Sequence, residues 1–184
     1  FFMFKDTLIN IDPIFTIIES PIIIMPQNIP FKEHMKLSYS NMSNGAIYNF
    51  DKKNAEWHYM EKIDKNTNTS LINTKLFSGG IFAVLSESMK PIIKNIHPSI
   101  NSTYSLNDIN KITFNLYDEH SGINYNSIYI KIDNEFLFYD YIKYRKLIRC
   151  DVDQALQPGK HSIETYAEDK LGNSIYKNGF FFIK

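Results

Sequence analysis

Hydrophobic and polar residues alternate along much of this chain, which is the pattern of β-strands with one buried face. Apolar side chains occupy every second position in the segments 35–40, 111–117, 127–133 and 146–152. No segment keeps the 3.6-residue repeat of an amphipathic helix for three turns. Short runs rich in Gly, Pro, Asn and Ser separate the alternating segments, as turns do. The pattern therefore predicts an all-β protein.

The hydrophobic pattern also divides the chain near residues 87–91. The apolar segment 81–85 ends there, and Lys90-Pro91 favours an extended crossing because the residue before a proline avoids the helical region. We predict two small β-sandwich domains in tandem, covering residues 1–88 and 89–184. The predicted strands of the first domain include 14–18 and 22–25. The second domain has seven predicted strands in roughly 95 residues, one of them at 135–139, and this number is typical of an immunoglobulin-like fold.

Composition and charge then exclude several classes of protein. The 20 Lys and Arg residues balance 20 Asp and Glu residues, which argues against a nucleic-acid partner. Cys150 is the single cysteine, so no internal disulfide can form. The longest apolar run, 17–25, is interrupted by a glutamate and a proline, so we expect no transmembrane segment in this chain. Since the chain opens on Phe1 rather than Met, we expect it to be a piece of a longer precursor.

Turn motifs in the second half of the chain resemble those of a module from bacterial envelope proteins. The segment 118–123 reads Asp-Glu-His-Ser-Gly-Ile and is similar to the D-x-x-S-G-I turn of that module. Further similar segments are 133–135 (an I-D-G hairpin), 158–161 (G-x-H), 167–173 (A-x-D-x-x-G-N) and the domain junction 78–93. In some lysostaphin-type zinc endopeptidases, which cut peptidoglycan, such a pair of β-domains follows the catalytic domain. The resemblance covers residues 75–184.

The resemblance implies the accessory tail of a peptidoglycan metallopeptidase, which positions the enzyme or binds cell wall or another envelope protein. It also implies a secreted, periplasmic or cell-surface location in a bacterium. The zinc site of the family needs a His-x-His pair, and the five histidines contain none, so we predict no catalytic residue in this chain. Whether the parent protein carries a peptidase stays open. The alternative is a surface adhesion or ligand-binding module, or a spacer, with no enzyme attached, and no oligomeric state is indicated.

Four carboxylates form the sharpest candidate cluster for a metal. Asp118 and Glu119 follow the second strand of the predicted immunoglobulin-like domain, and Glu168 and Asp169 follow the sixth. Those two loops lie at the same end of such a sandwich, and Ca²⁺ takes several oxygen ligands from loops of this kind. The interpretation that we favour is that Asp118 and Asp169 cap their own turns. We therefore predict no cofactor, with calcium as the one alternative.

A second candidate site consists of aromatic and basic residues. Tyr129, Tyr141, Tyr144 and Arg145 are candidate ligand-binding residues, because exposed aromatic side chains can stack on sugars or anchor a partner. The isoleucines of 128–132 should face the core, so Tyr129 should face solvent. The interpretation that we favour is ordinary cross-strand pairing of the aromatic residues and a solvated, basic edge strand.

Overall fold

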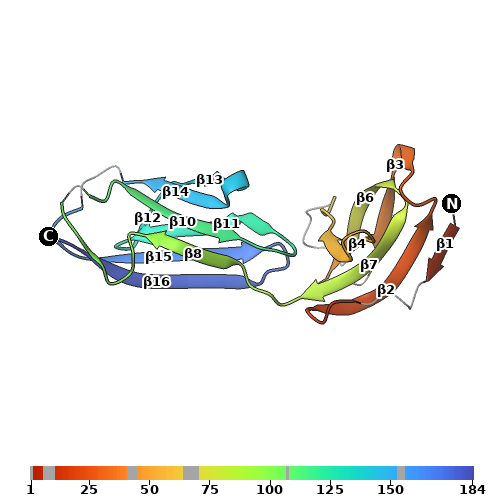
Figure 1. Ribbon diagram of the computed structural model, residues 1–184, viewed down its shortest axis with the longest axis horizontal. Coiled ribbons are helices and arrows are strands. Elements are labelled where there is room, and N and C mark those ends of the chain that lie inside the picture. The colour runs from red at the N-terminus through yellow and green to blue at the C-terminus, as the bar shows by residue number, and fades with distance from the viewer. Residues whose placement is uncertain (1, 6–10, 41–44, 64–70, 107, 153–155) are drawn as a thin grey trace. The chain divides into compact units, whose positions relative to one another are not determined.

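The computed structural model describes residues 2–5, 11–40, 45–63, 71–106, 108–152 and 156–184, with the backbone alone for residues 2–5 (Figure 1). The chain divides into two compact units, Phe1–Met89 and Lys90–Lys184. Sequence analysis placed the boundary one residue earlier.

The first unit consists of two antiparallel sheets. Its strands are β1 (Phe2–Lys5), β2 (Phe15–Met25), β3 (Pro30–Tyr39), β4 (Ala46–Asp51), β5 (Glu56–Tyr59), β6 (Ile72–Ser78) and β7 (Gly80–Glu87). One sheet has the order β1-β2-β7-β4-β5, and β3 pairs with β6 in the other. Both sheets contribute to one apolar core, which contains Ile24 and Val84 of the first sheet and Leu76 of the second. The alternating residues Met35 and Leu37 of β3 pack against that core, as their spacing predicts.

A single strand, β2, replaces the two strands that sequence analysis predicts at 14–18 and 22–25. The pairing of β2 with β7 shifts register twice between Ile17 and Ile22. Pro21 lies inside this irregular stretch, and a bulge is one of the few places where a strand tolerates a proline. The polar interruption that resembles a turn in the sequence is therefore a bulge within one strand.

The second unit is a sandwich of two larger sheets (Figure 1). Its elements are β8 (Ile92–His97), β9 (Thr103–Tyr104), β10 (Lys111–Tyr117), β11 (Ile123–Ile132), β12 (Glu135–Phe136), β13 (Asp140–Ile142), the 3₁₀ helix η1 (Lys143–Arg145), β14 (Leu147–Asp151), β15 (Gly159–Asp169) and β16 (Ser174–Ile183). One sheet has the order β13-β14-β10-β8 and the other β12-β11-β15-β16-β9. These are the D-E-B-A and C′-C-F-G strands of an immunoglobulin sandwich, with β9 parallel to β16. The prediction of an all-β, β-sandwich fold is confirmed.

Alternating apolar residues of the second unit fill the space between its sheets. Phe114 of β10, Ile130 of β11 and Ile148 of β14 are at most 1% exposed. Each fully buried side chain of this size contributes about 1.5–3 kcal/mol through the hydrophobic effect. Cys150 is also fully buried there, and burial together with the nearby Asp151 and Asp140 raises the pKa of its thiol to about 12.

Candidate binding site

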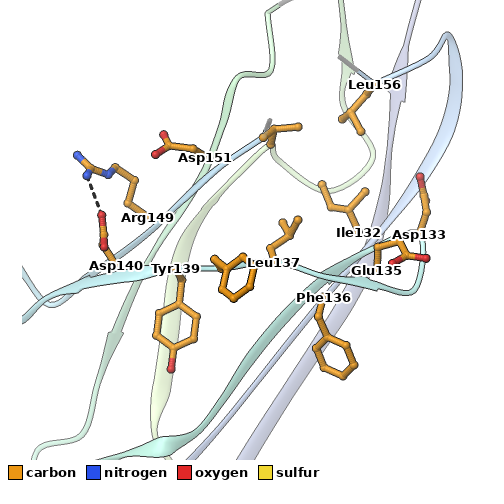
Figure 2. Close-up of a pocket in the computed structure, with 12 residues that line it drawn as sticks. Ile132, Asp133, Glu135, Phe136, Leu137, Tyr139, Asp140, Arg149, Asp151 and Leu156 are labelled. Atoms are coloured by element: carbon orange, nitrogen blue, oxygen red, sulfur yellow. Dashed lines mark hydrogen bonds and ion pairs between the residues drawn. The ribbon is translucent and has the colours of Figure 1, made fainter. Parts of the chain in front are cut away.

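A pocket of about 740 Å³ lies in the second unit, where the chain crosses from one sheet to the other. β12 ends at Phe136 and β13 begins at Asp140 in the opposite sheet, so the residues between them cross the open side of the sandwich. A volume of this size is within the range of small-molecule sites. Figure 2 shows the side chains that line the pocket, which are Ile132, Asp133, Glu135, Phe136, Leu137, Phe138, Tyr139, Asp140, Arg149, Asp151, Val152 and Leu156.

Apolar side chains form the inner wall of this pocket. Leu137, Val152 and Leu156 are half-buried and pack against the core of the sandwich. The backbone N–H of Leu137 donates a hydrogen bond to the carbonyl of Ile130 at 2.9 Å, which holds the crossing segment against β11. Phe138, the next residue, is 96% exposed. So large an exposed ring beside an apolar wall provides a contact surface for a bound molecule.

Charged groups lie on two sides of the apolar wall (Figure 2). On one side, Nη2 of Arg149 donates to the carboxylate of Asp140 at 2.8 Å, and Asp151 lies nearby. On the other side, Asp133 and Glu135 lie close together at the β11–β12 turn. The lining thus contains four carboxylates and one guanidinium group.

Arg149 carries an unsatisfied donor within this lining. Its Nε atom is buried and has no hydrogen-bond partner among the residues that the structure describes, although its Nη2 pairs with Asp140. A buried N–H group without an acceptor costs about 1–3 kcal/mol. Because this atom is buried, it is also closed to an acceptor on a bound molecule.

His161 of β15 contacts Asp133, one of the residues that line the pocket. Its side chain is 10% exposed, its Nδ1 lies 2.6 Å from Oδ2 of Asp133, and its Nε2 lies 2.7 Å from the carbonyl oxygen of Gln157. Both neighbours are acceptors, so the protonated ring, which donates from both nitrogens, satisfies both contacts. The ring also stacks on Phe181, with 5.5 Å between centroids.

The pKa values of this pair shift in opposite directions. Burial lowers the pKa of His161, but the hydrogen bonds to Asp133 and to the Gln157 carbonyl and the charge of Asp133 raise it by more. For Asp133, partial burial raises the pKa, while hydrogen bonds from His161 and Ser162 and the charge of His161 lower it by more. The net result is a raised His161 pKa and a lowered Asp133 pKa, which favours the charged pair.

The predicted calcium residues do not converge as a group. Oxygens of Asp118 and Asp169 lie within 4.8 Å of each other, but Glu119 is exposed. Glu168 follows Tyr166 by two positions on β15 and accepts a hydrogen bond from its hydroxyl group. Adjacent strand residues face opposite sides of a sheet, so Glu168 points away from the side on which Asp169 lies.

Asp118 and Asp169 cap turns in the structure. Oδ1 of Asp118 accepts hydrogen bonds from the N–H groups of His120 and Gly122 at 3.0 and 2.7 Å. Oδ1 of Asp169 accepts hydrogen bonds from the N–H groups of Leu171 and Asn173, each at 2.8 Å. These are the side-chain to backbone contacts that stabilise Asx-type turns.

The predicted aromatic and basic residues are also spread apart. Tyr129 lies on β11, where its ring stacks on that of Tyr166 at 5.1 Å, and Tyr141 on β13 donates its hydroxyl to the carbonyl of Leu116 at 3.1 Å. Tyr144 and Arg145 are exposed on η1, with the guanidinium carbon 5.3 Å from the centre of the Tyr144 ring. None of the four lines the pocket that the structure describes in this unit.

The first unit contains a more polar pocket of about 560 Å³. Several of its polar groups are already engaged. Lys52 donates to the side chain of Gln27 at 3.0 Å, and Asp51 accepts hydrogen bonds from Lys53 N–H and from Asn54, both at 2.8 Å. The pocket of the second unit combines an apolar wall with the exposed ring of Phe138 and is therefore the stronger candidate site.

Comparisons with known proteins give a likeness of fold only. No family model matches the chain, and no curated protein matches it. The structure of CopC from Methylosinus trichosporium OB3b is similar with a TM-score of 0.42 and 10% identity, over 51% of this chain and 93% of that one. PcoC, a methionine-rich copper resistance protein from Escherichia coli, is similar with a TM-score of 0.40 and 15% identity, over 52% and 100%. Dimeric latent PorU from Porphyromonas gingivalis is similar with a TM-score of 0.38 and 12% identity, over 82% and 20%.

These comparisons correct the cofactor prediction. Sequence analysis predicted no cofactor, with calcium as the one alternative. That prediction is wrong, because the metal named for a similar structure is copper. In the structure Asp118 and Asp169 instead cap their own turns. Within either unit, no three described His, Cys, Asp or Glu residues bring their ligand atoms within 4.8 Å of one another.

Among the described residues, no helix is long and apolar enough to cross a membrane.

Proposed function

We propose that the second unit is a ligand-binding module of a bacterial cell-envelope protein, and that its pocket receives an apolar side chain of a partner protein. The observation that carries the proposal is the apolar wall formed by Leu137, Val152 and Leu156 beside the exposed ring of Phe138. Isolated exposed apolar residues are ordinary, but an exposed aromatic ring at the mouth of a pocket is typical of interaction sites.

The expected affinity follows from the area that the pocket can bury. Complete burial of a Phe side chain contributes about 1.5–3 kcal/mol, and an open pocket gives the lower part of that range. This gain alone supports very weak binding, so we expect a short peptide to bind with a Kd on the order of tens of millimolar. A full partner would add contacts around the pocket.

A neutral pentapeptide tests the proposal directly. We expect N-acetyl-Ser-Ser-Phe-Ser-Ser-amide to cause saturable ¹⁵N–¹H shift changes centred on Leu137, Val152 and Leu156 of the full chain. Phe138→Ser should weaken binding by about fivefold or more, because truncating a hot-spot aromatic residue costs over 1 kcal/mol. Tyr144→Ser is the matched control, since Tyr144 is 81% exposed in the same unit but lies outside the pocket lining.

Two results would contradict the proposed function. One is the absence of saturable shift changes at the pocket. The other is binding to purified peptidoglycan sacculi that Phe138→Ser leaves unchanged, because the binding surface would then lie elsewhere on the chain.

The envelope setting rests on the turn motifs that resemble those of lysostaphin-type endopeptidases. The turns that begin at Asp118 and Asp169 carry the resemblance, and the hydrogen bonds that they accept explain why each motif needs its aspartate. We propose that the chain is the accessory tail of such an enzyme, outside the cytoplasm. The coding sequence upstream of Phe1 should then contain a His-x-His pair. An upstream sequence of further sandwich domains alone would contradict a peptidase parent.

A further inference from the structure

We infer that the pocket selects a polypeptide segment whose apolar side chain is flanked by basic side chains. The inference rests on the proposed function, because it names the partner chemistry of the same pocket. It is carried by the arrangement of charges around the apolar wall.

Carboxylates outnumber positively charged groups in the pocket lining. Four carboxylates face one guanidinium group, and that group pairs with Asp140. Asp133 forms an ion pair with His161. The Lys111 amine lies 4.0 Å from the Asp151 carboxylate, and the side chains of Lys111 and Asp151 are at least half exposed. No ion pair joins Glu135 to another residue that the structure describes. Glu135 is therefore the one carboxylate of the lining without an ion pair to a described residue.

The carboxylates lie on two sides of the apolar wall, so a bound segment would need a basic side chain on each side. Asp140 and Asp151 lie on one side of Leu137, and Asp133 and Glu135 lie on the other (Figure 2). In an extended segment, side chains two positions apart point to the same face, about 6.6 Å apart along the chain. A segment with an apolar residue at one position and basic residues two positions before and after it would place a cation on each side of its apolar side chain.

Three peptides test this inference with the full chain. They are N-acetyl-Lys-Ser-Phe-Ser-Lys-amide and the versions in which both lysines are replaced by serine or by glutamate. At low salt the lysine peptide should bind about three- to tenfold more tightly than the serine peptide, and the glutamate peptide should bind least tightly. At about 0.5 M salt the ratio of the Kd values of the serine and lysine peptides should approach one, because salt screens the exposed charges around the pocket.

A pair of Glu→Gln variants then locates the preference. Glu135→Gln should reduce the preference for lysine over serine about twofold, since it removes the carboxylate that no described cation opposes. Glu164→Gln on β15 is the control, because Glu164 is absent from the pocket lining and is paired across the sheet with Lys131.

The outcomes separate this inference from the proposed function. Equal binding of the lysine and serine peptides at the pocket would overturn the inference and leave the proposed function standing. Failure of all three peptides to bind would overturn both. A lysine preference that Glu135→Gln and Glu164→Gln reduce equally would also overturn the inference, because the selectivity would then come from overall charge.

Discussion

Replacing Asp133 with asparagine removes the charge nearest to the buried ring of His161. In the structure this carboxylate lies 2.6 Å from Nδ1 of His161, and its other oxygen accepts a hydrogen bond from Ser162 N–H at 2.8 Å. A hydrogen bond between charged groups contributes about 1.5–3 kcal/mol. The Asp133 side chain is 45% exposed, so solvent screening reduces the effect, and we expect Asp133→Asn to lower the free energy of unfolding by about 1–2 kcal/mol at pH 6.

The effect of this substitution should depend on pH in a defined direction. The folded pKa of His161 is raised, so its contribution is fully present below the ordinary histidine value of 6.5 and is lost as the pH rises through the raised value. The folded pKa of Asp133 is lowered, so its contribution is present above 3.8 and is lost as the pH falls through the lowered value. The difference between wild type and Asp133→Asn is therefore greatest between pH 3.8 and 6.5 and shrinks at alkaline pH.

Urea unfolding and an NMR titration together check this prediction. Unfolding followed by circular dichroism at pH 6 and pH 9 gives the difference in stability, and the ring protons of His161 report its pKa. Asp151→Asn is the control, because its carboxylate lies 4.0 Å from Lys111 with both side chains exposed, and such a pair contributes little. Equal stabilities of wild type and Asp133→Asn at pH 6, or an unchanged titration of His161 in the variant, would refute the reasoning.

Three further predictions concern stability and reactivity. Phe114→Ala should lower the free energy of unfolding by about 3–5 kcal/mol in urea, since the ring is 1% exposed; a loss below 1 kcal/mol would contradict its place in the core. Asp169→Ala should cost about 1–3 kcal/mol, because Leu171 and Asn173 lose the acceptor of their N–H groups; a stability equal to that of wild type would argue against the capping role. Cys150 should react with a thiol reagent at pH 8 far more slowly in the folded chain than in urea, because burial raises its pKa to about 12; equal rates would contradict its burial.

Sequence analysis could predict the fold where one face of a strand is buried and the other is solvated. In β10 and β11 the alternation of Ile and Phe with polar residues indicates both the strand and its inward face, and the structure buries those positions. The short edge elements β9 and β13 could not be predicted, because strands of two or three residues carry too little alternation. Their pairing depends on the sheets already present.

The pocket could not be predicted because the alternation fails where it forms. Residues 136–139 read Phe-Leu-Phe-Tyr, a continuous apolar run that has no period of two. The run therefore predicts a strand over 135–139, whereas β12 ends at Phe136 and the chain crosses to the other sheet. Which of the four side chains faces inward is decided by that crossing. The run of apolar residues next to charged ones was the only signal of the site.

The candidate residues of the turns were found because their chemistry is local. Asp118 and Asp169 contact N–H groups two and four positions along the chain, which a motif can indicate. The contact of Asp133 with His161 joins residues that are 28 positions apart. Such a contact depends on strand register, which composition and spacing do not determine.

The most direct test of the account is a measurement of intermolecular nuclear Overhauser effects between the full chain and N-acetyl-Lys-Ser-Phe-Ser-Lys-amide. If the pocket is the binding site, the phenyl protons of the peptide should give contacts to the methyl groups of Leu137, Val152 and Leu156. Contacts confined to other surfaces of the chain, or no contacts at a peptide concentration that saturates the shift changes, would contradict the assignment of the pocket as a binding site.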